Sequence, residues 1–514
     1  MNRLLLRLGA WLLAAAMLGG CALPSLDGRV ASYAIGANHD TRIGKAMLPL
    51  AAAHPGLSGV HVLTDGRDAF AARLLMADAA ERSLDVQYYI WRNDTTGTLL
   101  FQALRAAAGR GVRVRLLLDD NNTVGLDEAL AQLATQPNLE VRLFNPFAGR
   151  HARMLGFLAD FSRLNRRMHN KSFTLDGQAT IVGGRNVGDV YFDATGDVLF
   201  ADLDILAVGA VVASVEQDFD RYWNSASAYP LRLLVSALDP AAAAAQARQS
   251  DALAGAPAAL AYLASVRASS FVADITQQKL ALEWAPVQLV SDDPAKVLGQ
   301  AAPGASVARR LPALLGKPVR QVDLVSPYFV PGPSWSSRFA ELASRGVKVR
   351  ILTNSLEATD VVAVHAGYAK WRPALLRAGV TLMELKRSWT RETEPKRGSG
   401  VGGSSASSLH AKTFEVDLAR VFVGSFNLDP RSIDLNTEMG FVIESRVLAQ
   451  RMSDVLDGRV DERAYEVKLS PEGTLYWIEH TPAGVVRHDS EPGAGLLQRG
   501  AVEFMQLLPI DWML

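Results

Sequence analysis

Helical and strand-like hydrophobic patterns alternate along most of this chain. Residues 68–83 (DAFAARLLMADAAERS) place apolar side chains at helical spacing, and residues 84–90 (LDVQYYI) follow as a run rich in strand-forming residues. Residues 96–110 (TGTLLFQALRAAAGR) return to the helical pattern before a second strand-like run at 112–118 (VRVRLLL). This alternation predicts an α/β fold in which helices flank central sheets of mainly parallel strands.

The pattern occurs twice. HNKSFTLDGQATIVGGRN (169–186) and HAKTFEVDLARVFVGSFN (410–427) share His, Lys, Phe, Asp, Val, Gly and Asn in the same order with the same gaps. The correspondence continues upstream, where 84–91 matches 322–330 and 110–122 matches 345–355. We therefore predict two pseudo-symmetric copies of one α/β unit.

Changes in composition suggest where the units begin and end. The alanine-rich stretch 236–264 favours a helical connector. The Gly/Ser-rich stretch 391–408 precedes the second motif, and both a lid over a site and an ordinary flexible insertion fit it. The predicted division is a leader at 1–20, an N-terminal extension at 21–57, a first repeat at 58–235, a connector at 236–280, a second repeat at 281–460, and a C-terminal segment at 461–514 that packs on the repeats.

The first residues are typical of a targeting segment. Two arginines precede an apolar stretch at 8–18 that is too short to span a bilayer, and LGGC follows it. This resembles the lipobox of bacterial lipoproteins, which implies a lipidated Cys21 as the mature N-terminus; an ordinary signal sequence or an uncleaved anchor is the alternative. Because Ala22 replaces the aspartate associated with inner-membrane retention, the resemblance implies a periplasm-facing lipoprotein in the outer membrane of a Gram-negative bacterium.

Charge and cysteine content exclude several kinds of site. Lys plus Arg and Asp plus Glu number 53 each, so no global positive field attracts nucleic acid, and we expect no nucleic-acid partner. The single cysteine, Cys21, excludes an internal disulfide and a multi-cysteine metal site. An anionic ligand must therefore be bound by local groups.

The repeated motif carries residues suited to such a ligand. Residues two apart in a strand share a face, so His169 lies beside Lys171, and the second copy repeats the pair as His410 and Lys412. One copy alone would be read as a solvated strand face. Two copies with identical spacing, each followed by VGGRN or VGSFN, indicate a functional site instead.

Both copies match the pattern H-x-K-x4-D-x6-G-G/S-x-N in full, and in this they resemble the phospholipase D superfamily. The resemblance covers roughly residues 58–450. Four further stretches resemble the bacterial cardiolipin synthase branch: YYIWRNDTTG, LNRRMHNKSF, SPYFVPG and LTNSLEATDVVAVHAGY. The resemblance implies one active site at the interface between the repeats, without metal or cofactor.

In that family one histidine attacks phosphorus and forms a phosphohistidine, while the other donates a proton to the leaving alkoxide and then deprotonates the acceptor. The resemblance implies His169 as nucleophile and His410 as acid/base, although the near symmetry makes this assignment reversible. Fixed cations are needed to offset the negative charge of a phosphodiester. Lys171 and Lys412 are therefore expected to bind the phosphate oxygens. The neutral donors expected beside the lysines are Asn186 and Asn427.

Other residues are expected to support this set. A nucleophilic imidazole needs an acceptor on its second nitrogen, and Glu438 and Asp202 follow their motifs at matching positions, with Asp204 as the competitor of Asp202. Asp176 and Asp417 complete the motif as catalytic candidates, while capping of the backbone is the alternative. Gly183, Gly184, Gly424 and Ser425 either allow a close approach of the backbone or serve packing.

Two weaker groups have a structural and a functional interpretation each. His365 and Tyr368 fit a helix near the site, as core residues or as substrate contacts. Arg163, Arg166 and Arg167 precede the first motif, either as a solvated helix face or as contacts to a lipid headgroup.

The leading hypothesis is a phosphatidyltransferase that makes cardiolipin from phosphatidylglycerol, with phosphatidylethanolamine as a second candidate donor. Phospholipids and the membrane, reached through the anchor, are then the partners, and the sequence identifies no accessory protein. Hydrolysis to phosphatidic acid uses the same residues, and a nuclease or a silent envelope scaffold is a more distant alternative.

Overall fold

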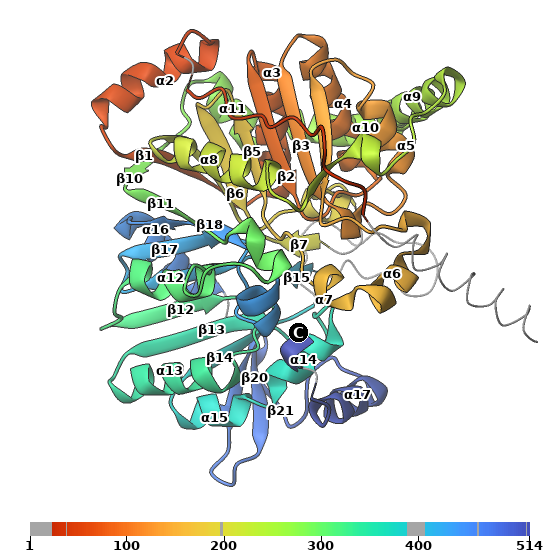
Figure 1. Ribbon diagram of the computed structural model, residues 1–514. Coiled ribbons are helices and arrows are strands. Elements are labelled where there is room, and N and C mark those ends of the chain that lie inside the picture. Colours follow the sequence, from red (N-terminus) through yellow and green to blue (C-terminus); the bar gives the residue numbers. More distant parts are fainter. Residues whose placement is uncertain are drawn as a thin grey trace, which may run out of the picture.

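A computed structural model describes residues 23–37, 39–195, 199–387, 407–459, 462–509 and 511–513. The predicted leader with Cys21 and most of the Gly/Ser-rich stretch 391–408 lie outside the described residues. The described chain forms two large sheets with helices on their faces, one above the other in Figure 1. This confirms the predicted α/β class.

The first sheet has nine strands in the order β10-β1-β8-β6-β5-β2-β3-β4-β9. Every residue of β2, β5 and β6 is buried, and four of the six residues of β1 are buried, so the sheet is covered by helices over most of its area. Its strands are β1 (Ser58–Leu63), β2 (Ser83–Tyr88), β3 (Arg113–Asp119), β4 (Leu139–Phe144), β5 (Ser172–Leu175), β6 (Ala179–Gly183), β8 (Asp204–Gly209), β9 (Ala228–Pro230) and β10 (Glu283–Ala285).

The second sheet has ten strands in the order β11-β18-β17-β16-β12-β13-β14-β19-β20-β21. Its first eight strands repeat the order of the first sheet from β1 to β9, so these eight strands have counterparts, whereas β10, β20 and β21 have none. The strands are β11 (Val287–Ser291), β12 (Gln321–Val325), β13 (Lys348–Asn354), β14 (Thr381–Leu385), β16 (Thr413–Val416), β17 (Arg420–Gly424), β18 (Met439–Ile443), β19 (Ala464–Leu469), β20 (Leu475–Thr481) and β21 (Gly484–His488).

The strands are less parallel than the helix–strand alternation predicts. Parallel pairing in the two large sheets is limited to β2-β3-β4 and β12-β13-β14, and every other described pair within them is antiparallel. Within each set, strands that neighbour each other in the sheet also follow one another in the chain and are joined through helices, which allows the crossover that parallel pairing needs. The motif strands β5 and β6 instead form a tight hairpin, which forces antiparallel pairing.

Helices of the first half are α2 (Arg42–Ala53), α3 (Gly66–Ala79), α4 (Thr95–Gly109), α5 (Asp127–Leu133), α6 (Arg153–Ala159), α7 (Phe161–Leu164) and α8 (Val211–Trp223). The connector 236–280 forms α9 (Pro240–Ala254), α10 (Pro257–Arg267) and α11 (Ser270–Thr276), which contact α3, α4 and α5. Those of the second half are α12 (Val307–Leu315), α13 (Gly332–Ser344), α14 (Val362–Ala369), α15 (Arg372–Arg377), α16 (Arg446–Asp454) and α17 (Leu496–Gln506). Within the described residues no single helix could cross a membrane by length and hydropathy, although α10 and α11, bent by 52°, pass that test as a pair.

The two halves meet through a shared apolar core. Val182 and Ile205 of the first sheet pack in one cluster with Val423 and Phe441 of the second sheet. A small two-stranded sheet, formed by β7 (Leu199–Ala201) and β15 (Ser407–Leu409), also joins the halves in parallel. These contacts set the relative position of the two motifs.

Candidate active site

Each motif histidine lies just before a buried strand of its own sheet, and its backbone pairs with the other half. His169 precedes β5 and its N–H donates to the carbonyl of Thr437 at 2.9 Å. His410 follows β15, and its N–H donates to the carbonyl of Ala201 at 2.8 Å. The backbone exchange between the halves therefore brings the two imidazoles to one interface.

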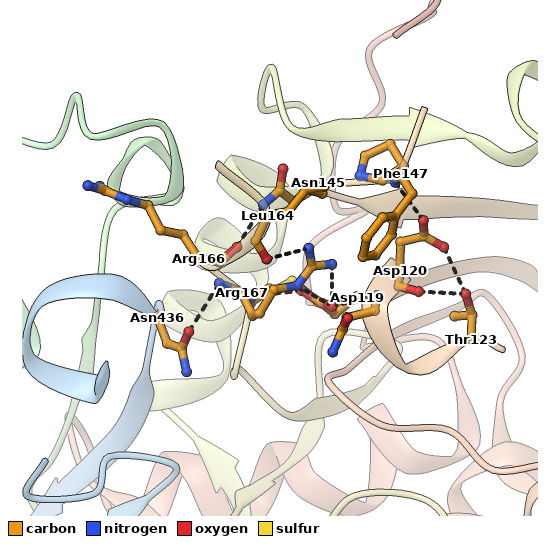
Figure 2. Close-up of polar contacts among 12 residues, drawn as sticks. Asp119, Asp120, Thr123, Asn145, Phe147, Leu164, Arg166, Arg167 and Asn436 are labelled. Carbon is orange, nitrogen blue, oxygen red and sulfur yellow. Dashed lines mark hydrogen bonds and ion pairs between the residues drawn. The ribbon is translucent and has the colours of Figure 1, made fainter. Parts of the chain in front are cut away.

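The residue before each histidine is held by the end of the central parallel strand. Asp119, which ends β3, accepts hydrogen bonds from the Met168 N–H at 2.8 Å and from the Arg167 side chain at 2.6 Å (Figure 2). In the second half Asn354, which ends β13, exchanges two hydrogen bonds with the backbone of Leu409, at 2.9 and 3.1 Å. The aligned positions Asp119 and Asn354 thus position the two histidines, a role that sequence reasoning missed.

Each imidazole is paired with a carboxylate from the opposite half. His169 Nδ1 lies 2.8 Å from Glu438 Oε2, and His410 Nδ1 lies 2.5 Å from Asp202 Oδ2. A hydrogen bond from Nδ1–H to a carboxylate leaves Nε2 with its lone pair facing the substrate. Asp204 is not the partner, because it forms a buried ion pair with Arg73 at 2.8 Å.

The two lysines are buried beside these histidines. Lys171 and Lys412 are each 1% exposed, and the ammonium of each donates to the carbonyl of the histidine two residues earlier. Burial lowers the pKa of Lys171 to about 7 and also lowers the pKa of Lys412. Two ammonium groups held at a dry interface can bind one phosphate anion, whose negative charge would restore their ordinary protonation.

The two histidine–carboxylate pairs differ in charge. Burial, followed by the charges of Lys171 and Lys412, holds the pKa of His169 well below its usual range. Burial also lowers the pKa of His410, but the charge of Asp202 opposes this shift. Burial raises the pKa of Glu438 to about 7. Burial also acts to raise the pKa of Asp202, but the charge and hydrogen bond of His410, together with the charges of Lys412 and Arg185, lower it. The site therefore favours a neutral His169 and an ionised partner for His410.

The two motifs also differ at the position beside each carboxylate. A Cβ atom at Gly184 would lie 2.1 Å from Asp202 Oδ1, so the absence of a side chain makes room for that carboxylate. The aligned Ser425 has a side chain, and its hydroxyl donates to Glu438 Oε2 at 2.5 Å. The role of Gly184 is thus to accommodate the Asp202 carboxylate, which differs from both roles that the sequence suggested for it.

Replacing Gly184 with alanine should displace Asp202 from His410. We expect turnover to fall about 10- to 100-fold, and the free energy of unfolding to fall by about 1–3 kcal/mol because the neighbouring carboxylate must move. Turnover and urea unfolding measure both effects. Gly109→Ala is the matched control, because no atom lies within 4 Å of a Cβ there; equal losses in both variants would contradict the assignment.

The structure does not bring Asp176 and Asp417 to this site, which corrects their place among the catalytic residues. Each lies beyond the far end of its motif strand, in a turn, with φ of 50° and 57°. Asp176 accepts from the backbone N–H of Arg82 and Ser83, both at 2.8 Å, and Asp417 accepts from that of Arg320 at 2.7 Å. Both carboxylates therefore cap the start of the neighbouring strand, β2 or β12.

The two motif asparagines have different surroundings. Asn186 accepts from the Ile90 N–H and donates to the Tyr191 hydroxyl, both at 3.1 Å, so its amide is engaged within the protein. Asn427 is buried, and its Oδ1 has no hydrogen-bond partner among the described residues. The unpaired atom of Asn427 is an acceptor, which suits a hydroxyl group of a ligand rather than a phosphate oxygen.

Aromatic residues that the sequence did not single out border the imidazoles. Tyr89 meets His169 edge-on at a centroid distance of 5.0 Å and lies 5.6 Å from Lys171 Nζ. Tyr191 and Phe200 lie against His410, at 5.3 and 5.1 Å. Tyr89 belongs to the strand-like run YYI, but its direction toward the histidine is set by the tertiary structure.

The weaker candidates are structural. His365 lies between Glu491 and Arg372, at 3.1 and 2.7 Å, and Tyr368 donates to Glu384 at 3.0 Å. Arg167 is turned inward to Asp119, as Figure 2 shows. Arg163 binds Asn145 Oδ1 at 2.6 Å, and Arg166 binds the Lys296 carbonyl at 3.0 Å. Within the described ranges no group of three or more His, Cys, Asp or Glu side chains is placed to hold a metal ion.

Known proteins are similar to this chain in sequence and in fold. The family described as "Cardiolipin synthase, PLD-like domain" matches residues 74–223 and 311–459. Cardiolipin synthase C of Escherichia coli (strain K12) is 47% identical over 478 residues, which are 92% of this chain and 100% of that protein. An uncharacterised protein of Helicobacter pylori (strain J99) is 30% identical over 92% of both chains.

Among solved structures, phosphatidylserine synthase of Haemophilus influenzae Rd KW20 superimposes with a TM-score of 0.57 and 15% identity, over 93% of this chain and 100% of that one. At that identity the likeness concerns the fold alone. The family match covers both repeats, and the identity to cardiolipin synthase C extends over nearly the whole chain. The chain therefore belongs to the cardiolipin synthase family with phospholipase D-like domains.

Proposed function

We propose that this protein is a phosphatidyltransferase that makes cardiolipin through a phosphohistidine intermediate. The observation that carries the proposal is the pair of buried imidazoles, each held by a carboxylate of the opposite half, with two buried lysines beside them. The end-to-end relation to a cardiolipin synthase adds the substrate class, phospholipids.

In the first step His169 Nε2 attacks phosphorus while the bond from phosphorus to the headgroup oxygen breaks. His410, protonated on Nε2, gives its proton to that leaving oxygen. Lys171 and Lys412 neutralise the non-bridging oxygens as charge builds up on them. The product of this step is a phosphatidyl group on His169 and a free alcohol.

In the second step the hydroxyl of a phosphatidylglycerol headgroup gives its proton to His410 and attacks phosphorus. The nitrogen–phosphorus bond breaks, which releases cardiolipin and restores a neutral His169. The charge difference between the pairs supports this division of roles: His169 is held neutral, as a nucleophile must be, and the ionised Asp202 can stabilise a protonated His410. Asp202 and Glu438 act as positioning residues.

We further propose that Cys21 carries a lipid anchor and that the enzyme faces the periplasm from the outer membrane. The lipobox-like LGGC and the following Ala22 support this location. Phosphatidylglycerol serves as acceptor, and either phosphatidylglycerol or phosphatidylethanolamine as donor.

Purified full-length protein should convert labelled phosphatidylglycerol to labelled cardiolipin. Product analysis with and without phosphatidylethanolamine shows which lipid is the donor, since an ethanolamine donor releases ethanolamine rather than glycerol. Phosphatidic acid as the sole product would mean that the protein is a hydrolase and not a transferase. If the wild type forms no product in either mixture and so behaves like the His169→Asn variant, neither the transferase nor the hydrolase is supported.

A further inference from the structure

Helix α6 turns large apolar side chains toward the outside of the molecule. Met154, Leu155 and Leu158 are 81%, 67% and 80% exposed, and no residue of α6 is buried. On its inner side the helix rests on Phe147, which meets Phe157 edge-on at 5.1 Å. The outer face of α6 is therefore apolar, the opposite of what a surface helix in water shows.

Helix α17 has the same inverted character. Leu496, Leu497, Phe504 and Leu507 are 81%, 92%, 62% and 82% exposed, at or next to the helix. Their spacing places them along one side of the helix, while Val502 packs with α14 on the other side. The outer side of α17 is therefore mainly apolar, with Glu503 as an exposed charge at its edge.

The two helices belong to one surface. Phe161 of α7, which directly follows α6, meets Trp512 near the end of α17 at a centroid distance of 6.2 Å, and both rings are about half exposed, at 43% and 57%. Figure 1 shows α6, α7 and α17 on the same side of the molecule. We call the outward apolar side chains of α6, α7 and α17, together with Trp512, the apolar rim.

The apolar rim lies on the side of the active site. Helices α6 and α7 are inserted between the carboxyl end of β4 and His169, and α14, which carries α17, is inserted between β13 and β14. Both insertions begin at the carboxyl edge of the parallel strands, which is where ligands bind in sheets of this kind. Asn165 at the end of α7 also binds Arg431, six residues before Thr437.

The start of the described chain approaches the same region. Arg29, eight residues after Cys21, binds the carbonyls of Ser225 and Ala228, the latter at 2.9 Å. Asn145 binds the carbonyl of Ser227 between them at 2.7 Å, and its side chain binds two carbonyls of the α7 region. Eight residues of extended chain reach at most about 28 Å, so a lipid on Cys21 would be tethered beside the apolar rim.

We infer that the apolar rim is a membrane-docking surface whose occupant is the lipid bilayer. Contiguous exposed apolar side chains of this size mark an interaction site, and protruding leucines and aromatics on two short helices suit insertion among lipid headgroups and acyl chains. The inference rests on the proposed function: a phosphatidyl group can reach His169 with its acyl chains still in the bilayer when the rim is docked. The anchor alone would tether the enzyme without orienting its site.

An environment-sensitive fluorophore on a single introduced cysteine tests the docking. Cys21 is the only natural cysteine, so the lipidated full-length Leu497→Cys variant offers one free thiol. On addition of vesicles of phosphatidylglycerol and phosphatidylethanolamine we expect its emission to shift to the blue and rise at least about twofold, with quenching by lipid-borne quenchers. Val485→Cys, 64% exposed on the β20–β21 hairpin, is the matched control and should not change.

Loss of the rim should impair turnover only at a bilayer. The Leu155→Gln, Leu158→Gln double variant should lose at least about tenfold of its activity on vesicles and keep its kcat on a short-chain, monomeric phosphatidylglycerol. The Val319→Gln variant, 67% exposed before β12, should keep both activities. If the wild type turns over neither lipid, the proposed function fails, while the fluorophore still decides on docking.

Two results would overturn the inference. An unchanged emission at position 497 with vesicles would show that the rim stays in water. An emission change that follows protein concentration without vesicles, and disappears in the α6 double variant, would show instead that the rim binds a second copy of this chain.

Discussion

A His169→Asn variant should lose at least about 10⁴-fold of the wild-type turnover and form no covalent adduct with a labelled phospholipid. Asparagine retains a donor for Glu438 but has no nucleophilic nitrogen. His410→Asn should also lose at least about 10²- to 10⁴-fold, because the proton donor and acceptor is removed. In that variant, however, label from the phosphatidyl group should accumulate on the protein, since the second step is slowed while His169 remains.

Denaturing quenches at alkaline pH, followed by separation of protein from free lipid, measure the adduct. His365→Asn is the matched control: that histidine is buried between Glu491 and Arg372, so its loss should lower the stability and leave kcat within about threefold. Label on the His169→Asn protein and none on the His410→Asn protein would reverse the two roles.

The repeat made much of this architecture predictable. Identical residues at identical gaps required two equivalent units, and the eight matching strands follow the same order in both sheets. The direction of the strands was not predictable from the alternation of helices and strands. The two motif strands are joined by a tight turn instead of a helix, and this makes them antiparallel. Asp176 and Asp417 form part of that turn, so their place in the motif reflects the hairpin and its capping bonds.

The partners of the histidines show where sequence reasoning ends. Glu438 and Asp202 were recognised by their matching positions after each motif, but sequence proximity says nothing about which histidine each one reaches. Each carboxylate crosses to the other half, because the backbone next to it pairs there: Thr437 with His169, and Ala201 with His410. The docking of the two sheets through their shared apolar core decides this pairing, and no local pattern encodes it.

An Asp202→Asn variant should lower kcat/KM about 10²- to 10⁴-fold at every pH between about 6 and 9. Although burial opposes it, the charge and hydrogen bond of His410 with the charges of Lys412 and Arg185 lower the pKa of Asp202. This carboxylate therefore stays ionised over the whole interval, and its loss is felt equally throughout. Glu438→Gln should behave differently. The pKa of Glu438 is raised to about 7 by burial, so the native carboxyl is mostly neutral at pH 6, and glutamine resembles it.

Above pH 7 the ionised Glu438 accepts more strongly from His169 Nδ1–H and increases the electron density on Nε2. The ratio of wild-type to Glu438→Gln kcat/KM should therefore rise from a few-fold near pH 6 to about 10² near pH 8.5, and this ratio cancels titrations common to both proteins. Glu415→Gln is the matched control, because burial also raises the pKa of Glu415 to about 7 but its partner is Gln321. A flat ratio for Glu438→Gln, with a rising one for Asp202→Asn, would mean that His410 is the nucleophile and that the charge difference between the pairs runs the other way during turnover.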